Sequence, residues 1–128
     1  MIVGLGTDVS EVARIAAAIA RRGERLLRRV FTPEEIAFCR GRRRPAEHFA
    51  ARFAAKEAVF KALGTGRALG VRWTDVEVRR EPAGRPSVRL AGGARRRAES
   101  LGAERVWVSL ASAGDRAWAV AVLESGSD

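Results

Sequence analysis

Cysteine and histidine are nearly absent from this chain of 128 residues, which holds one of each, Cys39 and His48. A single cysteine cannot form a disulfide within the chain, and one cysteine with one histidine supplies too few ligands for a structural zinc site. No apolar run approaches the roughly 20 residues that cross a bilayer, and the N-terminal residues lack the charged start and long apolar stretch of a signal peptide. We therefore expect a cytoplasmic protein that has no membrane partner.

Lysine is also scarce, because arginine supplies all but two of the 24 basic residues of a chain whose formal net charge is +9. The excess is concentrated in residues 14–44, which hold ten arginines and only three glutamates. An arginine-rich face attracts acidic partners, and the alternatives are nucleic acid, an acidic protein and a face that contacts solvent alone. The basic stretches 21–29 and 40–44 contain no aromatic residue on which a base could stack. We therefore expect no nucleic acid partner.

Hydrophobic periodicity and turn residues predict an α+β fold in a single domain, residues 1–128. Thr32, followed by Pro33 and two glutamates, is typical of a helix start with threonine as the N-cap. Gly64 marks the end of a long helix that begins near Ala46. The predicted helices are 8–19, 25–30, 33–39, 46–63 and 94–101, and the predicted strands are 2–6, 76–80, 87–90, 106–110 and 117–123.

The predicted helix 46–63 is apolar nearly all round, which is typical of a buried helix. It nevertheless carries Arg52, Lys56, Glu57 and Lys61, and buried charges are unfavourable without partners. Glu57 and Lys61 lie four residues apart and share one face of the helix. This spacing is compatible with an ordinary helical ion pair, but the apolar surroundings favour a ligand site.

Asp8 is a second candidate carboxylate, and it follows a glycine-rich predicted strand. Asp8, Ser10 and Glu11 are typical of a helix start, so one interpretation makes Asp8 an N-cap. The other interpretation joins Asp8 to Glu57 and a lysine in a site for a divalent metal and a phosphate. Mg²⁺ takes one or two carboxylates together with phosphate oxygens and water, so these residues suit it.

These residues fall into three motifs: G-x-G-x-D at residues 4–8 with Glu11 and Arg14, R-F-x-x-K-E at 52–57, and K-x-x-G-x-G at 61–66. The combination resembles the holo-[acyl carrier protein] synthases, the 4′-phosphopantetheinyl transferases of fatty acid synthesis, over essentially the whole chain. The resemblance implies transfer of 4′-phosphopantetheine from coenzyme A to a serine of an acidic apo acyl carrier protein, with release of adenosine 3′,5′-bisphosphate. It also implies a mostly antiparallel sheet packed on a long central helix, and a homotrimer with active sites at subunit interfaces.

The resemblance implies that three residues form the catalytic centre. Asp8 and Glu57 match the family's metal ligands, with Mg²⁺ completed by the coenzyme A pyrophosphate and water. Lys61 matches the lysine that contacts the pyrophosphate. The attacking serine belongs to the carrier, so the chain needs no nucleophile of its own. Glu57, acting directly or through water on the metal, is the candidate general base.

The resemblance also implies residues that bind the two substrates. Lys56 lies in the second motif, but its direction on the helix differs from that of Lys61 by more than about 90°. An indirect contact and a contact on the adenosine side both remain open for Lys56. The other residues implied at coenzyme A are Arg52, Gly64 and Thr65 at the nucleotide end and Pro86 at the adenine pocket. The residues implied in carrier docking are Arg14, Arg22, Arg25 and Arg28.

One position departs from the family pattern. Many members end a late strand with a histidine, whereas this chain has Ser112. Some members lack that histidine, and Ser112 leaves open a rival function in which the fold binds coenzyme A without turnover. His48 does not align with that position, so we interpret it as an ordinary residue at a helix start. The arginines at 42–44 either hold the coenzyme A 3′-phosphate or form a solvated loop, and we favour the loop.

Overall fold

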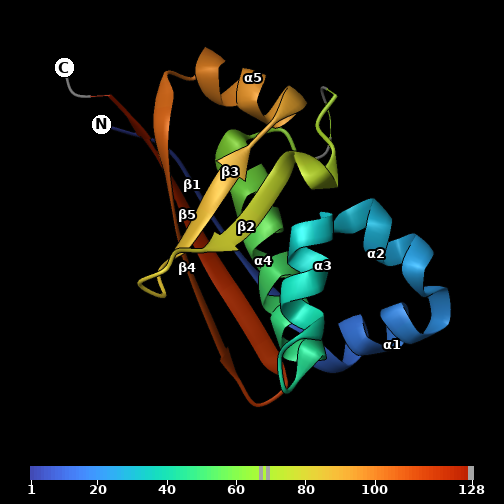
Figure 1. The fold of residues 1–128 in the computed structure, drawn as a ribbon. Coiled ribbons are helices and arrows are strands. Elements are labelled where there is room, and N and C mark those ends of the chain that lie inside the picture. The colour runs from blue at the N-terminus through green and yellow to red at the C-terminus, as the bar shows by residue number, and fades with distance from the viewer. Residues whose placement is uncertain (67, 69, 127–128) are drawn as a thin grey trace.

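The computed structural model describes residues 1–66, 68 and 70–126 (Figure 1). The described strands are β1 (Ile2–Glu11), β2 (Val76–Arg80), β3 (Pro86–Leu90), β4 (Ala103–Ala113) and β5 (Arg116–Ser125). The described helices are α1 (Val12–Arg22), α2 (Glu24–Val30), α3 (Pro33–Arg40), α4 (Pro45–Leu63), α5 (Gly92–Ser100) and the 3₁₀ helix η1 (Trp73–Asp75). Strands β1, β5 and β4 pair antiparallel in that order, and β2 and β3 form a separate antiparallel hairpin. The predicted α+β class with antiparallel sheets is confirmed.

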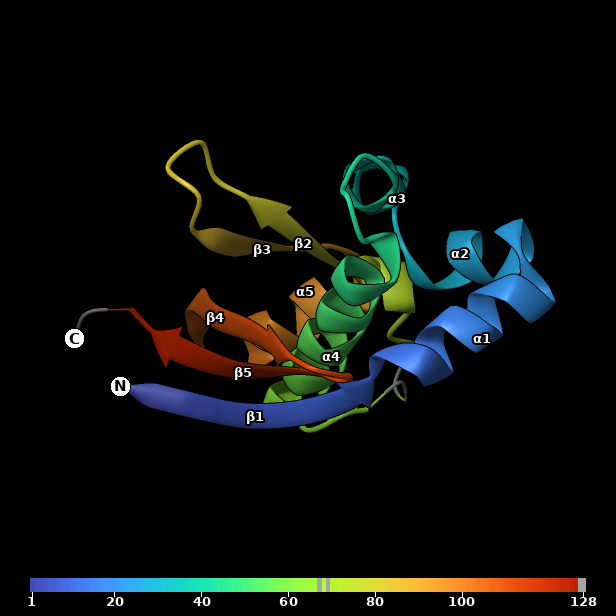
Figure 2. The same ribbon diagram turned by 90° about the horizontal axis from the view of Figure 1, so that it is seen from below.

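Helix α4 packs against β1 and β5 on one side and contacts α3 and β2 on the other (Figure 2). This packing buries α4 on most of its circumference, as its nearly continuous apolar surface predicts. Neither α4 nor any other helix within the described ranges is long and apolar enough to cross a bilayer. Helices α1 and α2 extend beyond the end of the three-stranded sheet, where a second small core forms (Figure 1). Its buried members are Leu27, Val30, Phe31, Ile36, Cys39 and Phe49.

Strand β1 and helix α4 approach each other closely because two glycines face two alanines. A Cβ atom built on Gly6 would lie 2.0 Å from the carbonyl oxygen of Ala58. A Cβ atom on Gly4 would lie 2.3 Å from the carbonyl oxygen of Ala62. Real Cβ atoms do not tolerate such distances, so only glycine permits this contact. The backbone of β1 therefore lies directly on the backbone of α4.

The predicted end of the first strand is wrong. The prediction stopped the strand at Gly6 and opened a helix at Asp8, but β1 continues to Glu11 and α1 begins at Val12. The cause is distant pairing: β1 stays in antiparallel register with β5 up to Glu11, which lies opposite Arg116. Tertiary pairing overrides the local preference of these polar residues for helix starts. The N-cap interpretation of Asp8 is therefore also wrong.

Two other helix boundaries predicted from capping signals, at Thr32 and at Gly64, are confirmed. Thr32 accepts a hydrogen bond from the backbone N–H of Glu35, and the Glu35 side chain accepts one from the backbone N–H of Thr32. This reciprocal capping box opens α3. Gly64 ends α4 in the left-handed conformation with φ 75°, as expected for a glycine at this position.

Lys56 and Glu35 form an ion pair in the protein interior. Both side chains have no exposed surface, and Lys56 Nζ lies 2.8 Å from Glu35 Oε1. Lys56 also donates to the backbone carbonyls of Trp73 and Val76. Glu35 accepts a further hydrogen bond from the backbone N–H of Val78 at 2.8 Å. Burial lowers the pKa of Lys56, and the Glu35 carboxylate opposes that shift. The pair therefore joins α3, α4, η1 and β2.

Replacing Lys56 with methionine should destabilise the fold, because the substitution leaves the Glu35 charge buried without its partner. We expect the free energy of unfolding, measured by urea denaturation at fixed protein concentration, to fall by about 3–5 kcal/mol. Lys61→Met is the matched control, because the side chain of Lys61 is 55% exposed in its ion pair with Asp8. That control should lose less than about 1 kcal/mol. A similar small loss in both variants would contradict a structural role for Lys56.

Candidate functional site

The structure brings Asp8, Glu57 and Lys61 together where β1 lies on α4. Asp8 points toward α4 because it shares the inner face of β1 with Gly4 and Gly6. Lys61 Nζ donates to Asp8 Oδ1 at 2.8 Å and to the backbone carbonyl of Thr7 at 3.0 Å. Glu57 lies one helical turn before Lys61, so its carboxylate is on the same face of α4. Two carboxylates and one ammonium from distant parts of the sequence thus meet at one place.

The charges at this place keep Lys61 protonated. The hydrogen bond to Asp8 raises the pKa of Lys61, the negative charges of Asp8 and Glu57 add to this shift, and slight burial opposes it. The ammonium is therefore a permanent positive charge beside two carboxylates.

Asp8 and Glu57 line a cavity of about 630 Å³ between β1, α1, α2 and α4. Its wall is acidic and polar near Asp8 and Glu57, and apolar toward α1 and α2. Arg14 on α1 and Arg116 on β5 add two cations. The apolar side chains of the lining on the inner side are Ile15, Ala18, Ile19, Leu26, Val30, Phe31 and Phe53.

The carboxylates of Asp8 and Glu57 fit a Mg²⁺ ion that shares its coordination with a substrate. Within the described ranges, no group of three or more histidine, cysteine, aspartate or glutamate side chains is placed to hold a metal alone. A cation at Asp8 and Glu57 would therefore need further oxygen ligands from phosphate and water. Mg²⁺ is commonly bound in this way, through one or two carboxylates together with substrate phosphates.

A second cavity, of about 290 Å³, lies between the start of α4, the β2–β3 hairpin and β4. Arg52 lines it and is only 5% exposed, and its Nε atom is buried without a hydrogen-bond partner among the described residues. The Arg52 guanidinium lies 4.1 Å from the ring centre of Phe38, and the guanidinium of Arg80 lies 5.6 Å from the same centre. A buried cation with an unsatisfied donor beside other cations is suited to an anion. The remaining lining residues are His48, Ala51, Val78, Arg79, Gly84, Pro86, Leu110, Ala111 and Ser112.

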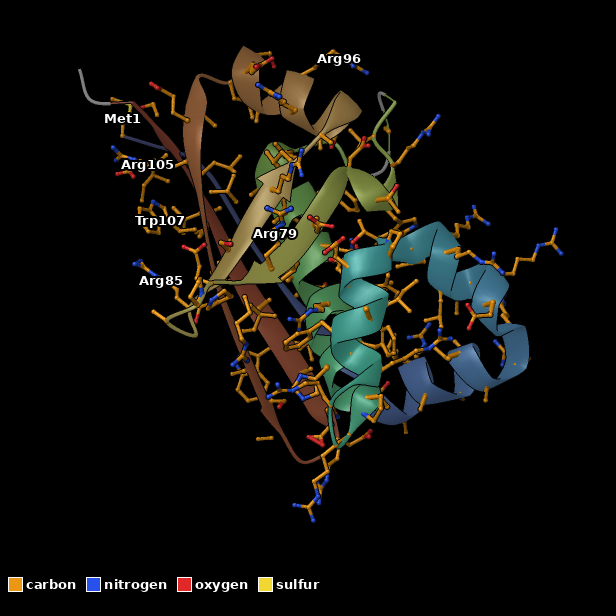
Figure 3. All side chains as sticks on the ribbon, in the orientation of Figure 1. Met1, Arg79, Arg85, Arg96, Arg105 and Trp107 are labelled. Carbon is orange, nitrogen blue, oxygen red and sulfur yellow. The ribbon has the colours of Figure 1, made fainter. Side chains whose placement is uncertain are left out.

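The hairpin that lines the second cavity is linked to β4. Arg85, at the hairpin turn, lies 5.8 Å from the ring centre of Trp107 on β4 (Figure 3). Trp107 in turn donates a hydrogen bond from Nε1 to Glu124 Oε1 at 3.0 Å. Gly84 and Pro86, on either side of Arg85, line the same cavity as Arg52.

Several predicted site residues lie elsewhere. Lys56 reaches neither cavity, because its Nζ is buried against Glu35 and two backbone carbonyls. Gly64 and Thr65, at the far end of α4 from Arg52, line neither cavity within the chain. Thr65 is buried, and its hydroxyl donates to the carbonyl of Gly66. A coenzyme A contact at any of these three positions remains a prediction.

The predicted docking arginines divide into two groups. Arg22, Arg25 and Arg28 line a basic depression on α1 and α2, together with Arg21 and Arg29, which the sequence prediction did not include. Arg29 lies four residues from Arg25 in the same helix, so helical spacing could have predicted that it shares the face of Arg25. Arg14 instead lines the cavity of Asp8 and Glu57. The basic surface therefore begins inside that cavity and continues over α2.

Ser10 is a site residue that the sequence did not predict. It shares the inner face of β1 with Asp8 and lines the same cavity. It is 6% exposed, and its hydroxyl has no hydrogen-bond partner within the described part of the chain. In a strand, residues two positions apart lie on the same face, so Ser10 could have been predicted from Asp8. The sequence prediction assigned these residues to a helix instead, and in a helix that spacing does not put them on one face.

Comparison with known proteins gives matches over nearly the full length. The chain matches the model of the 4′-phosphopantetheinyl transferase superfamily over residues 4–122. It is 51% identical over 128 residues to the holo-[acyl-carrier-protein] synthase of Desulforudis audaxviator (strain MP104C), in an alignment that covers 100% of this chain and 97% of that protein.

Solved structures agree with this match. The holo-[acyl-carrier-protein] synthase from Neisseria meningitidis is similar with a TM-score of 0.89 and 32% identity, covering 98% of this chain and 100% of that chain. A holo-(acyl-carrier-protein) synthase from Bacillus anthracis str. Ames, solved in complex with CoA (3′,5′-ADP), has a TM-score of 0.81 and 34% identity, covering 98% and 99%. The resemblance indicated by the three sequence motifs is thereby confirmed, and the chain belongs to the 4′-phosphopantetheinyl transferase superfamily.

Proposed function

We propose that the chain transfers 4′-phosphopantetheine from coenzyme A to a serine of an apo acyl carrier protein and releases adenosine 3′,5′-bisphosphate. The reaction depends on Mg²⁺ and serves fatty acid biosynthesis in the cytoplasm. The observation that carries the proposal is that Asp8 and Glu57 line one cavity while Lys61 donates a hydrogen bond to Asp8. The names of the relatives and the coenzyme A complex of one of them support it.

The catalytic residues have separate tasks in this reaction. The serine oxygen of the carrier forms a bond to the phosphorus that bears pantetheine, and the bond from that phosphorus to the bridging oxygen of the pyrophosphate breaks. Glu57 accepts the serine proton. Lys61 binds the pyrophosphate and stabilises charge that develops on the leaving phosphate, while Asp8 holds the Lys61 ammonium in place. When bound by Asp8 and Glu57, Mg²⁺ supplies further neutralisation of the pyrophosphate.

The nucleotide end of coenzyme A binds at the cavity of Arg52 and Pro86. Arg52 and Glu57 are five residues apart, which places them about 140° apart around α4. The two cavities consequently open on different sides of the helix and share no lining residue. One coenzyme A molecule therefore contacts the first cavity of one subunit and the second cavity of a neighbour. Gly64, Thr65 and Lys56 line neither cavity within one chain and stay predicted contacts.

This arrangement requires an oligomer, and we assign a homotrimer. Support comes from the outer face of the three-stranded sheet, which is apolar although it is exposed in the single chain. Val9 on β1 lies directly opposite Trp118 on β5, and both side chains point outward. Such a contiguous apolar face is typical of a protein interface. Its other exposed apolar side chains are Ile2, Leu5, Trp107 and Val120.

The basic surface of α1 and α2 is assigned to the acyl carrier protein. Arg22, Arg25 and Arg28 would meet the acidic carrier, and Arg14 would lie closer to the incoming serine. Charge pairs of this kind mainly accelerate and orient encounter, and they weaken as salt increases.

The transferase activity is tested by the intact mass of the carrier after incubation with the protein, coenzyme A and Mg²⁺. We expect a gain equal to phosphopantetheine, which EDTA, Asp8→Ala and Glu57→Ala each abolish. Glu99→Ala removes an exposed carboxylate of α5 and should leave the gain unchanged. Absence of any gain with several apo carriers would contradict the proposal, and coenzyme A binding without transfer would favour the rival in which Ser112 marks lost turnover.

Carrier docking is tested by reversing one charge on the basic surface. Arg25→Glu should raise the KM for the carrier about fivefold or more, because roughly 1 kcal/mol of attraction is lost. The KM for coenzyme A should not change. Arg96→Glu on α5, which is exposed far from α2 (Figure 3), is the matched control for net charge. Equal increases in both KM values would contradict the docking assignment.

The trimer is tested by light scattering. We expect the wild-type mass to be three times the 13.9 kDa of one chain. Trp118→Glu places a charge on the apolar face, so it should reduce the mass to that of one chain and abolish transfer, although Trp118 lines neither cavity. A wild-type monomer that transfers phosphopantetheine would overturn both the trimer and the shared site.

A further inference from the structure

His48 lies in the cavity of Arg52, although its sequence position gave it no function. It is located in the first turn of α4, and its ring meets that of Phe38 edge-on with centroids 5.8 Å apart. His48 lines the cavity together with Arg52 and Arg80, and Ser112 of β4 also lines it. An imidazole is therefore placed among guanidinium groups in a cavity suited to an anion.

The charged groups around His48 are mostly positive. Arg52 on α4, Arg42 in the preceding loop and Arg80 on β2 all act on it, and Arg79 lines the same cavity. The carboxylate that opposes them is Glu47, which is itself 3.6 Å from Arg44. Burial and the three arginines lower the pKa of His48 below its ordinary value of 6.5. The free protein therefore holds a neutral imidazole there at neutral pH.

The chemistry of coenzyme A indicates which anion enters this cavity. The molecule carries a pyrophosphate and one phosphate monoester. The proposed function places the pyrophosphate at Asp8, Glu57 and Lys61. The monoester then remains as the anion available to the second cavity, and it carries up to two negative charges, with a second pKa near 6.

We propose that His48 is a ligand of the phosphate monoester of coenzyme A and takes up a proton when that phosphate binds. The inference rests on the proposed function, because it needs coenzyme A as the substrate. A dianion placed among Arg52, Arg80 and His48 cancels the repulsion that keeps the imidazole neutral. The protonated ring then donates a charge-assisted hydrogen bond to the phosphate. In this cavity the imidazole thus comes from α4, whereas β4 contributes Ser112 at the position where many family members have histidine.

Proton uptake makes coenzyme A binding depend on pH in a defined direction. The pKa of His48 is lower in the free protein than in the complex, so affinity increases as pH falls through the pKa of the complex. The increase ends below the pKa of the free protein, where both states are protonated. Each pKa unit between the two states corresponds to about tenfold in affinity. Protonation of the phosphate itself acts in the opposite direction near pH 6, so the comparison must be made against a variant that lacks the imidazole.

The chain contains one histidine, which allows a direct measurement. In protein without a histidine tag, the NMR signal of that single imidazole reports its titration without assignment. We expect a midpoint below pH 6.5 in the free protein and a clearly higher midpoint with saturating coenzyme A. Dephospho-coenzyme A, which lacks the monoester, should leave the midpoint close to that of the free protein.

A binding experiment with His48→Gln complements the titration. Between about pH 7.5 and 5.5, the affinity of the wild type for coenzyme A should increase about tenfold relative to that of the variant. If the protein binds coenzyme A and transfers phosphopantetheine while the histidine titration stays unchanged, the role of His48 is overturned and the transferase function stands. Identical pH profiles of the wild type and His48→Gln would overturn that role in the same way. No binding of coenzyme A at any pH would overturn the proposed function and this inference together.

Discussion

The close approach of β1 to α4 is the constraint on which the rest of the structure depends. Gly4 and Gly6 have no side chains, so the backbone of β1 lies directly against the backbone of α4 at Ala62 and Ala58. Any larger residue would have to move the strand or the helix, because protein interiors have little free volume. The contact places Asp8 within 2.8 Å of Lys61. The first motif and the third are thus distant in the sequence but form one physical unit.

Helix α4 carries three cations that have different roles because they differ in direction. Lys56 points into the interior, where its three donors meet Glu35 and two carbonyls. Lys61 is exposed and points to Asp8, which lines the first cavity, whereas Arg52 lines the second cavity. Lysine is a compact charge with freely rotating donors, whereas arginine is a planar fork. This difference gives a physical reason for lysine at 56 and 61 in a chain that otherwise uses arginine.

The sequence predicted features that depend on local signals and missed those that depend on distant partners. The capping box at Thr32 and the left-handed Gly64 are local, and both boundaries are confirmed. The end of β1 was predicted wrongly, because its pairing with β5 involves residues more than a hundred positions away. Helical periodicity showed that Lys56 faces away from Lys61, but it could not reveal Glu35 as the partner. The environment of His48 was hidden for the same reason, since apart from Arg52 its neighbours come from α3, a loop, β2 and β4.

Adding one methyl group at the contact between β1 and α4 tests most directly whether this contact builds the site. Gly6→Ala should lower the free energy of unfolding and strongly reduce phosphopantetheine transfer, because it forces Asp8 away from Glu57 and Lys61. Gly41→Ala adds the same methyl group at the end of α3, where the nearest atom is 3.5 Å away and φ is −79°, and should behave as the wild type. Wild-type stability and turnover in Gly6→Ala would contradict the claim that the close approach of β1 to α4 builds the site.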